Sequence, residues 1–168
     1  PEQFTMQAQR NIVENSTGHG TFNIDIVSFN RLAYRVFEEL GVELPTAIDD
    51  TGKNLILRKI IDENKKKLTL IRPKDSQGFV SEIKSVISEL LQYSVTPKML
   101  GDACTRLDEG GLNNNERLKR KLNDISLIYS GFRDYISDKY ITTEEITGIL
   151  CEHVDRSKIL ENAIIAFD

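Results

Sequence analysis

The stretch IDIVSFNRLAYRVFEELG, residues 24–41, changes character halfway along its length. Its first part alternates between apolar and polar side chains, which is the period of a β-strand, so we expect a strand over 22–27. Ser28 fits the N-cap of a helix, and the apolar residues that follow it return every three or four positions. Gly41 fits the left-handed position that ends a helix. The stretch therefore predicts a strand that leads directly into an amphipathic helix.

Helical spacing dominates the rest of the chain. A Thr96-Pro97 pair is typical of a helix start, and Thr142 with Glu145 has the spacing of a capping box. Apolar residues at intervals of three and four predict six further helices, over 3–14, 54–66, 79–93, 97–107, 116–139 and 144–153. The final stretch AIIAFD, residues 163–168, has the composition of a buried strand that ends on an acid.

The helices between the two expected strands cover far more chain than an ordinary crossover connection needs. We therefore interpret the fold as a predominantly α fragment of α/β class, in which a large helical subdomain is inserted between two strands of a sheet. Because the sequence opens on Pro1 and stops as a strand delivers an acid, we expect the chain to be a piece of a longer protein.

Composition limits the function. The chain is 39% apolar and 29% charged with a net charge of −4, which favours a folded domain and argues against a surface that is basic throughout. No apolar run approaches the length of a membrane span, and no leader sequence is evident. Two cysteines, Cys104 and Cys151, without framework spacing indicate a reducing compartment, so we expect a cytoplasmic protein.

Catalytic motifs are absent from the sequence. It has no phosphate-binding GxxxxGK[ST] loop, no HExxH and no GxSxG, and Cys151 with His153 offers too few ligands for zinc. Glu144 and Glu145 are explained by the first turn of a helix, where the dipole favours acids. We therefore expect no catalytic residue, cofactor or metal in this chain itself.

Basic residues are unevenly distributed. Residues 53–74 contain eight basic side chains against two acids, and RLKRK at 117–121 is a second basic run. Such clusters bind phosphate backbones, but lysines near the end of a helix also interact favourably with its dipole. Both interpretations stay open for these two segments.

Phe29, Arg31 and Tyr34 follow the first expected strand. The carboxyl ends of strands face the ligand crevice of an open α/β sheet, where two aromatics and an arginine can stack on bases and hold a phosphate. The alternative is that Phe29 belongs to the core and Arg31 to the surface. Spacing alone does not separate these interpretations.

Several motifs taken in order resemble one known family. PEQFTMQ at 1–7, VSFNRLAYRVFEELG, LILRKII, GFVSEIKSVISELLQY and the closing IIAFD are similar to AddB, also called RexB, the second subunit of the bacterial AddAB helicase–nuclease. The resemblance covers essentially the whole chain. It implies the N-terminal UvrD-like helicase region, with 1–44 in RecA-like domain 1A, 45–160 as the inserted helical subdomain 1B, and 161–168 as a Walker-B-like strand ending on Asp168.

The resemblance also implies a function. It points to a DNA-binding part of an ATP-dependent helicase/deoxyribonuclease in double-strand-break repair, which contacts single-stranded DNA and scans for a recombination hotspot. The implied partner is AddA, the other subunit of the helicase–nuclease heterodimer, and the implied ATP, magnesium and iron–sulfur sites lie outside this chain. A helical module that docks the partner subunit without touching DNA is the alternative. The family's strand-contacting positions fall on six residues here: Glu2, Gln3, Thr5, Phe29, Arg31 and Tyr34.

Two positions depart from the family's pattern. Tyr34 stands where relatives also carry an indole, and Asn30 stands where serine is also seen. A phenol ring stacks on a base as an indole does, so the first departure leaves the expected role of Tyr34 intact.

Overall fold

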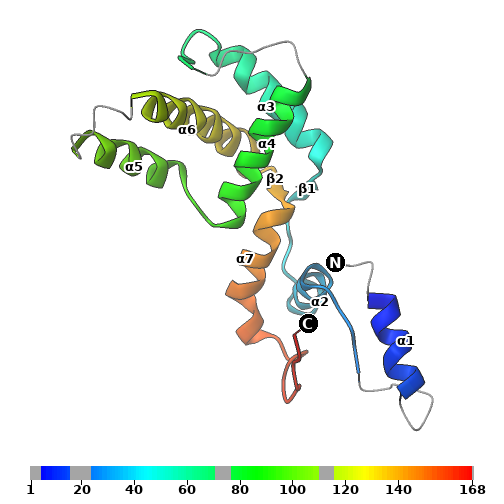
Figure 1. Cartoon of the computed structure of the whole chain (residues 1–168). Coiled ribbons are helices and arrows are strands. Elements are labelled where there is room, and N and C mark those ends of the chain that lie inside the picture. The colour runs from blue at the N-terminus through cyan, green and yellow to red at the C-terminus, as the bar shows by residue number, and fades with distance from the viewer. Residues whose placement is uncertain (1–4, 16–23, 71–76, 110–115, 168) are drawn as a thin grey trace. The chain divides into compact units, whose positions relative to one another are not determined.

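The structure, a computed structural model, describes residues 5–15, 24–70, 77–109 and 116–167. Glu2, Gln3 and Asp168 therefore lie outside the described residues. Helices dominate the described part, and one small sheet accompanies them (Figure 1). The α-helices and strands are α1 (Thr5–Asn15), α2 (Phe29–Leu40), β1 (Thr46–Ile48), α3 (Asp50–Asn64), α4 (Gln77–Gln92), α5 (Pro97–Glu109), α6 (Glu116–Ile136), β2 (Tyr140–Thr142) and α7 (Thr143–His153).

The chain divides into two compact units. The helical unit is residues 44–145, and the second unit, here called the split unit, combines residues 1–43 with residues 146–168. The assignment of these parts to domains 1A and 1B remains a prediction. The observed helical unit ends before residue 160, where the expected insert ended.

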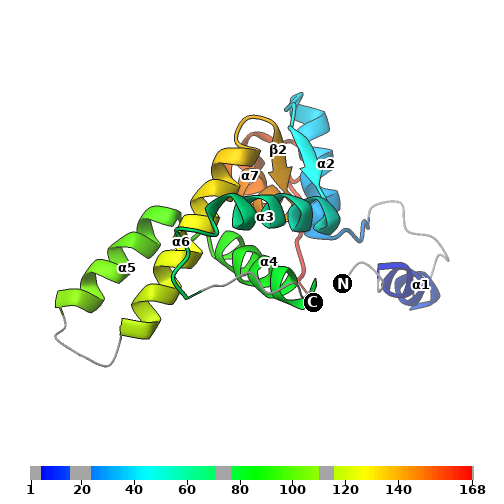
Figure 2. The same cartoon turned by 90° about the horizontal axis from the view of Figure 1, so that it is seen from above.

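The helical unit is organised around its longest helix, α6. Figures 1 and 2 both show α5 running alongside α6, while α3 packs on α6 and on α4. The apolar stripes that the spacing predicted on these helices face one another and form a single core. Its buried members are Ile48, Ile56, Leu57, Ile60, Ile61, Leu68, Ile83, Ile87, Leu91, Leu100, Ile125, Ile128, Tyr129, Phe132 and Ile136.

The two ends of the helical unit are joined by a parallel pair of strands. β1 and β2 pair in the register Thr46 to Tyr140 and Ile48 to Thr142. Parallel strands require a long connection, and here that connection consists of α3, α4, α5 and α6. Three residues are too few for a periodic sequence signal, and the sequence pattern predicted no strand there.

Few side chains are buried among the described residues of the split unit. In α2 the predicted caps are confirmed, because the Ser28 side chain accepts from the Arg31 N–H at 3.3 Å and Gly41 is left-handed with φ 65°. Ala33, Val36 and Phe37 are buried on α2, and the Phe37 ring lies edge-on to His153 of α7 with ring centroids 6.1 Å apart. The carboxylate of Glu39 accepts from the backbone N–H of Lys158 at 3.0 Å.

Both strands expected from the sequence are missing where the structure can be read. Residues 24–28 and 163–167 form no strand, although the helix-rich character of the fold is confirmed. An apolar sequence pattern indicates which side chains favour burial. A strand also needs a neighbouring strand that completes its backbone hydrogen bonds. Neither segment has such a neighbour among the described residues, and Ile164, Ile165 and Phe167 are exposed.

Predicted helix bounds differ from the observed ones mainly for α3. This helix begins at Asp50 rather than residue 54, because the Asp49 side chain accepts from the N–H of Gly52 at 2.7 Å and caps it. At α5, Thr96 accepts from the N–H of Met99 at 3.3 Å, which confirms the predicted cap. Among the described helices, none has both the length and the apolar character needed to cross a membrane.

Candidate nucleic-acid interface

The first turns of α2 carry the candidate residues that the structure describes best. The Ser28 cap fixes where the helix begins, and the three side chains after it all reach solvent. Phe29 is 57% exposed and Tyr34 is 49% exposed, so a ligand can reach part of each ring. The interpretation of Phe29 as a core residue is therefore wrong.

Helix geometry separates these three side chains into two groups. Arg31 and Tyr34 are three residues apart, so they are neighbours on one face of α2. Phe29 lies roughly 140° around the helix from Tyr34, as 3.6 residues per turn requires. It stacks on Phe167 instead, with ring centroids 6.1 Å apart and planes inclined by 21°. The structure thus brings Arg31 and Tyr34 together and pairs Phe29 with an aromatic from the far end of the sequence.

Neighbouring contacts orient this surface. The Tyr34 ring lies edge-on to the buried Phe37 ring, with ring centroids 6.3 Å apart. The phenol therefore packs against Phe37 on one side and faces solvent on the other. Arg35 forms an ion pair with Asp25 and is committed within the unit. Arg31 makes no ion pair with any described residue, so its guanidinium is available to an anion.

The other candidate positions are only partly visible. Thr5 is the first residue of α1 and is partly buried, whereas Glu2 and Gln3 lie outside the described residues. The expected convergence of the Gln3 and Arg31 segments on one groove therefore remains a prediction. The same holds for the Walker B position expected at Asp168.

The basic segment 53–74 needs one correction. Lys53 is only 2% exposed, and its ammonium donates to both carboxylate oxygens of Glu144, at 2.6 and 2.8 Å. It is therefore a buried ion-pair residue and not part of a phosphate-binding surface. Sequence reasoning could not find this pair, because its members are 91 residues apart.

Glu144 is held in its charged form by this contact. Burial alone would raise the pKa of its carboxyl, but hydrogen bonds from Lys53 and Ser88 and the attraction of Lys53 outweigh burial and lower the pKa. Its neighbour Glu145 accepts from the backbone N–H of Thr142, which is one of the two bonds of the predicted capping box, and it also accepts from the Thr142 hydroxyl and pairs with Arg133. The contacts of Glu144 and Glu145 thus stabilise the start of α7.

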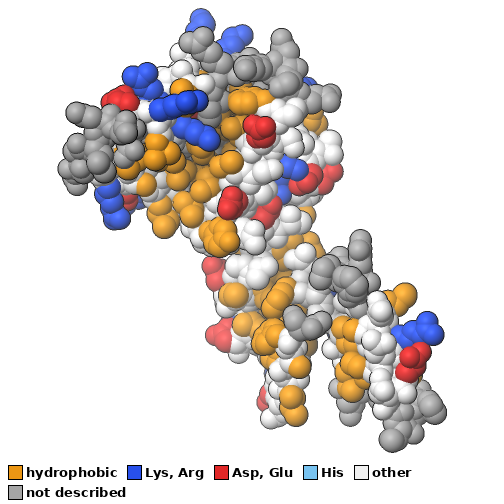
Figure 3. Space-filling model, viewed as in Figure 1, with side chains coloured by type: hydrophobic (Ala, Val, Ile, Leu, Met, Phe, Trp, Pro, Cys, Tyr) orange, Lys and Arg blue, Asp and Glu red, His pale blue; other side chains and the backbone are white. Residues whose placement is uncertain are grey.

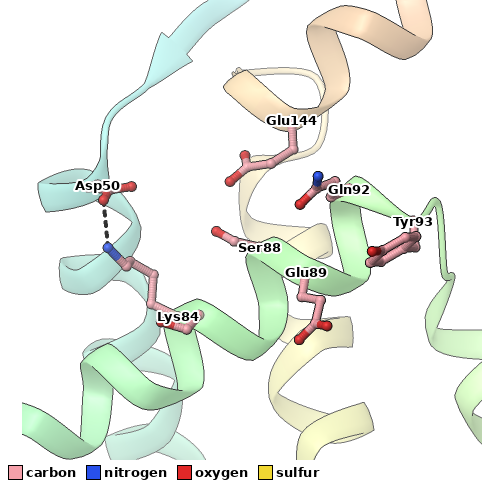
Figure 4. Close-up of a pocket in the computed structure, with 8 residues that line it drawn as sticks. Asp50, Lys84, Ser88, Glu89, Gln92, Tyr93 and Glu144 are labelled. Carbon is pink, nitrogen blue, oxygen red and sulfur yellow. Dashed lines mark hydrogen bonds and ion pairs between the residues drawn. The ribbon is translucent and has the colours of Figure 1, made fainter. Parts of the chain in front are cut away.

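An open cleft of about 480 Å³ lies beside this ion pair (Figure 4). Lys84 of α4 donates to Asp50 at 2.6 Å, and this contact lowers the pKa of Asp50. The cleft's three carboxylates outnumber its single ammonium, so it repels phosphate. Its lining residues are Asp50, Lys84, Ser85, Ser88, Glu89, Gln92, Tyr93 and Glu144.

Within the described residues, no group of three or more His, Cys, Asp or Glu side chains gathers as a metal site. Cys104 is buried and Cys151 is exposed, and both are free thiols. One residue at the α2 surface was missed from the sequence, namely Phe167. Its spacing indicated only burial in a strand, so no local signal marked it as the stacking partner of Phe29.

Comparison with known proteins finds matches that cover the whole chain. A family model described as ADDB, N-terminal, matches residues 1–168. The chain is 40% identical over its full length to a protein of Lachnoclostridium phytofermentans, 36% to one of Clostridium kluyveri and 37% to one of Alkaliphilus metalliredigens. Each of these relatives is named as the B-type subunit of an ATP-dependent helicase/deoxyribonuclease, and the chain spans 14% of the length of each.

Proposed function

The chain belongs to the ADDB N-terminal family, and from this premise we propose that it is the DNA-contacting N-terminal part of the B-type subunit of an ATP-dependent helicase/deoxyribonuclease. The observation that carries the proposal is similarity over all 168 residues to relatives of that name. The implied role is in double-strand-break repair in the cytoplasm. ATP hydrolysis and DNA cleavage are assigned to parts of the protein outside these residues, since the chain spans only 14% of its relatives.

We further propose that α2 holds single-stranded DNA. Tyr34 stacks on a base, and Arg31, its neighbour on the same face, binds a phosphate or a base edge. Phe29 with Phe167 forms a second aromatic surface of the same unit. Glu2, Gln3 and Thr5 are proposed to contribute polar contacts. In the full-length subunit these contacts would read the hotspot sequence as the strand passes.

Binding of labelled single-stranded DNA to the 168-residue chain tests the first step. The double variant Arg31→Ala, Tyr34→Ala should weaken binding about tenfold or more at low salt, because one stacked base contributes about 1–3 kcal/mol. The matched control is Arg156→Ala, Tyr93→Ala, which removes an exposed arginine and an exposed tyrosine from elsewhere. Equal losses in the two variants, or no binding by the parent chain at low salt, would reject the α2 site.

The scanning role needs the full-length subunit with its partner. Phe29→Ala or Arg31→Ala should reduce pausing at the hotspot sequence more than it reduces bulk unwinding, since only pausing depends on reading bases. A parallel loss of both activities would point to a folding defect instead.

A second function is supported by a separate observation. Ile24, Ile164 and Ile165 of the split unit are exposed, and Ile164 is fully so, which is unusual for β-branched apolar side chains. The relatives are each named as one subunit of an enzyme, so the other helicase–nuclease subunit, AddA, is the natural partner for such a surface. Capture of AddA by the chain, together with no DNA binding at low salt, would favour this function.

A further inference from the structure

The packing of α3 on α6 brings two separate basic segments to one end of the helical unit. Lys59 lies over the Tyr135 ring at 4.9 Å, and a Cβ placed on Gly131 would be 3.0 Å from Ile60. Just beyond the end of α3, the backbone N–H groups of Thr69 and Leu70 donate to the side chain of Asp124. Residue numbers therefore rise along α3 while they fall along α6, and the two helices run antiparallel.

This antiparallel register places the end of α3 beside the first half of α6. The Asp124 carboxylate holds the backbone just after residue 67, at 3.0 Å from the Thr69 nitrogen and 2.7 Å from the Leu70 nitrogen. At a rise of about 1.5 Å per residue, the basic run that precedes Asp124 on α6 begins within roughly 11 Å. We call the resulting surface the basic corner, and it consists of Lys65, Lys66, Lys67, Arg117 and Lys121.

The basic corner carries an excess of positive charge. All five of its side chains are exposed, and none of them forms an ion pair with a described residue. The nearest acids on α6 are already engaged, because Glu116 pairs with Arg120 at 3.2 Å and Asp124 is buried against the backbone. Figure 3 shows Lys and Arg side chains gathered over this end of the helical unit. In a chain of net charge −4, this is a local reversal of sign.

Favourable interaction with the helix dipoles does not explain all five cations of the basic corner. Lys65, Lys66 and Lys67 follow the C-terminal end of α3, where the helix dipole favours a positive charge. Arg117, however, lies in the first turn of α6, where the same dipole disfavours it. A cation that opposes the stability of its own helix suggests a ligand outside the chain.

The composition of the basic corner indicates which ligand that is. Residues 62–70 and 116–124 contain no aromatic side chain, so bases have nothing to stack on. Lysine and arginine without aromatics bind the phosphate backbone and leave base sequence unread. Resting on the proposed function in DNA metabolism, we propose that the basic corner is a sequence-independent binding surface for the phosphate backbone of DNA, separate from the α2 site.

The salt dependence of DNA binding by the 168-residue chain tests this proposal. Labelled single-stranded and duplex oligonucleotides of unrelated sequences are titrated at several salt concentrations. Arg117→Ala, Lys121→Ala should lower the slope of log K against log salt by about 0.9 for each phosphate that is no longer neutralised on duplex, or about 0.7 on single strands. The arm with the larger change identifies the form of DNA that the surface holds.

Two variants control for nonspecific effects. Arg156→Ala, Lys139→Ala also removes one arginine and one lysine, both exposed and outside the basic corner, and should leave the slope unchanged. Arg117→Lys, Lys121→Arg keeps both charges and should retain the parent slope. Circular dichroism of each variant checks that the helix content of the chain is unchanged.

The possible outcomes separate this proposal from the α2 proposal. Equal slopes for the basic-corner and control doubles would overturn the basic corner, as would an unchanged slope on both forms of DNA. Loss of binding to AddA with unchanged DNA binding would overturn it too, by identifying a protein-docking surface. If Arg31→Ala, Tyr34→Ala has no effect while Arg117→Ala, Lys121→Ala lowers the slope, the α2 site fails and the basic corner stands.

Discussion

The helical unit and the split unit differ in how far their apolar side chains are buried. In the helical unit, side chains from five elements meet in one core, and Phe132 and Ile128 are completely buried. Among the described residues of the split unit, the buried side chains lie on one face of α2 and at two positions of α7, while Phe29, Ile164 and Phe167 are exposed. Amphipathic helices supply their own partners by packing on each other, whereas extended segments need strands beside them. The helical unit thus has a core of its own, whereas the split unit leaves large apolar side chains exposed.

The largest expected effect compares two phenylalanines. Phe132→Ala removes a fully buried ring from α6 and should lower the free energy of unfolding by about 3–5 kcal/mol. Phe167→Ala removes a ring that is 78% exposed and should change it by less than about 1 kcal/mol. Urea denaturation followed by far-ultraviolet circular dichroism measures both. Similar losses would break the comparison, because the split unit would then possess a core of its own.

A smaller effect concerns the buried ion pair of the helical unit. Glu144→Gln leaves the buried Lys53 with only its longer ion pair to Asp50, at 3.7 Å, and should destabilise by about 3 kcal/mol at neutral pH. The pKa of Glu144 is lowered in the folded state, so its stabilisation is present above the ordinary value of 4.5 and is lost as pH falls through the folded pKa. The variant should therefore lose less stability on acidification than the parent chain.

Glu152→Gln is the matched control for that experiment, since Glu152 is an exposed residue of the same helix. It should stay within about 0.5 kcal/mol of the parent and keep the parent's pH profile. If Glu144→Gln behaves in the same way, the ion pair contributes nothing to the helical unit.

The smallest effects come from two glycines in helices. At Gly131, where α6 meets α3, a new Cβ would lie 3.0 Å from Ile60, so Gly131→Ala should cost about 1 kcal/mol despite the better helix propensity of alanine. At Gly148 of α7, no atom lies within 4 Å of the new Cβ, and Gly148→Ala should gain about 0.5–1 kcal/mol. Thermal unfolding should show a lower midpoint temperature for Gly131→Ala and a higher one for Gly148→Ala. Changes of the same sign would contradict the difference in packing at the two sites.

Local features of this fold could be predicted from the sequence. Ser28, Gly41 and the Thr142–Glu145 box act within a few residues of themselves, so spacing is enough to identify them. The buried faces of α3, α4 and α6 were predicted for the same reason, because each helix carries its own apolar stripe. The family resemblance carried by motifs along the sequence was confirmed as well.

Features that depend on distant pairing could not be predicted. Lys53 was counted among the surface cations, because its contact with Glu144 forms only in the folded chain. The strands expected at 22–27 and 163–168 depended on neighbouring strands that a local sequence pattern does not reveal. The two basic runs appeared unrelated because only the antiparallel packing of α3 and α6 unites them. At the α2 surface, composition pointed to Arg31 and Tyr34, but the direction of Phe29 required the helix itself.

The parallel pairing of β1 with β2 has a consequence for engineering. Paired strands lie about 4.8 Å apart, so the chain enters and leaves the helical unit at neighbouring points. Residues 49–139 could then be exchanged for another crossover connection, such as a single helix with its loops, or for a reporter domain whose own termini are adjacent. Such an exchange would show whether helices α3 to α6 contribute a function of their own to the full-length subunit or only connect the two strands.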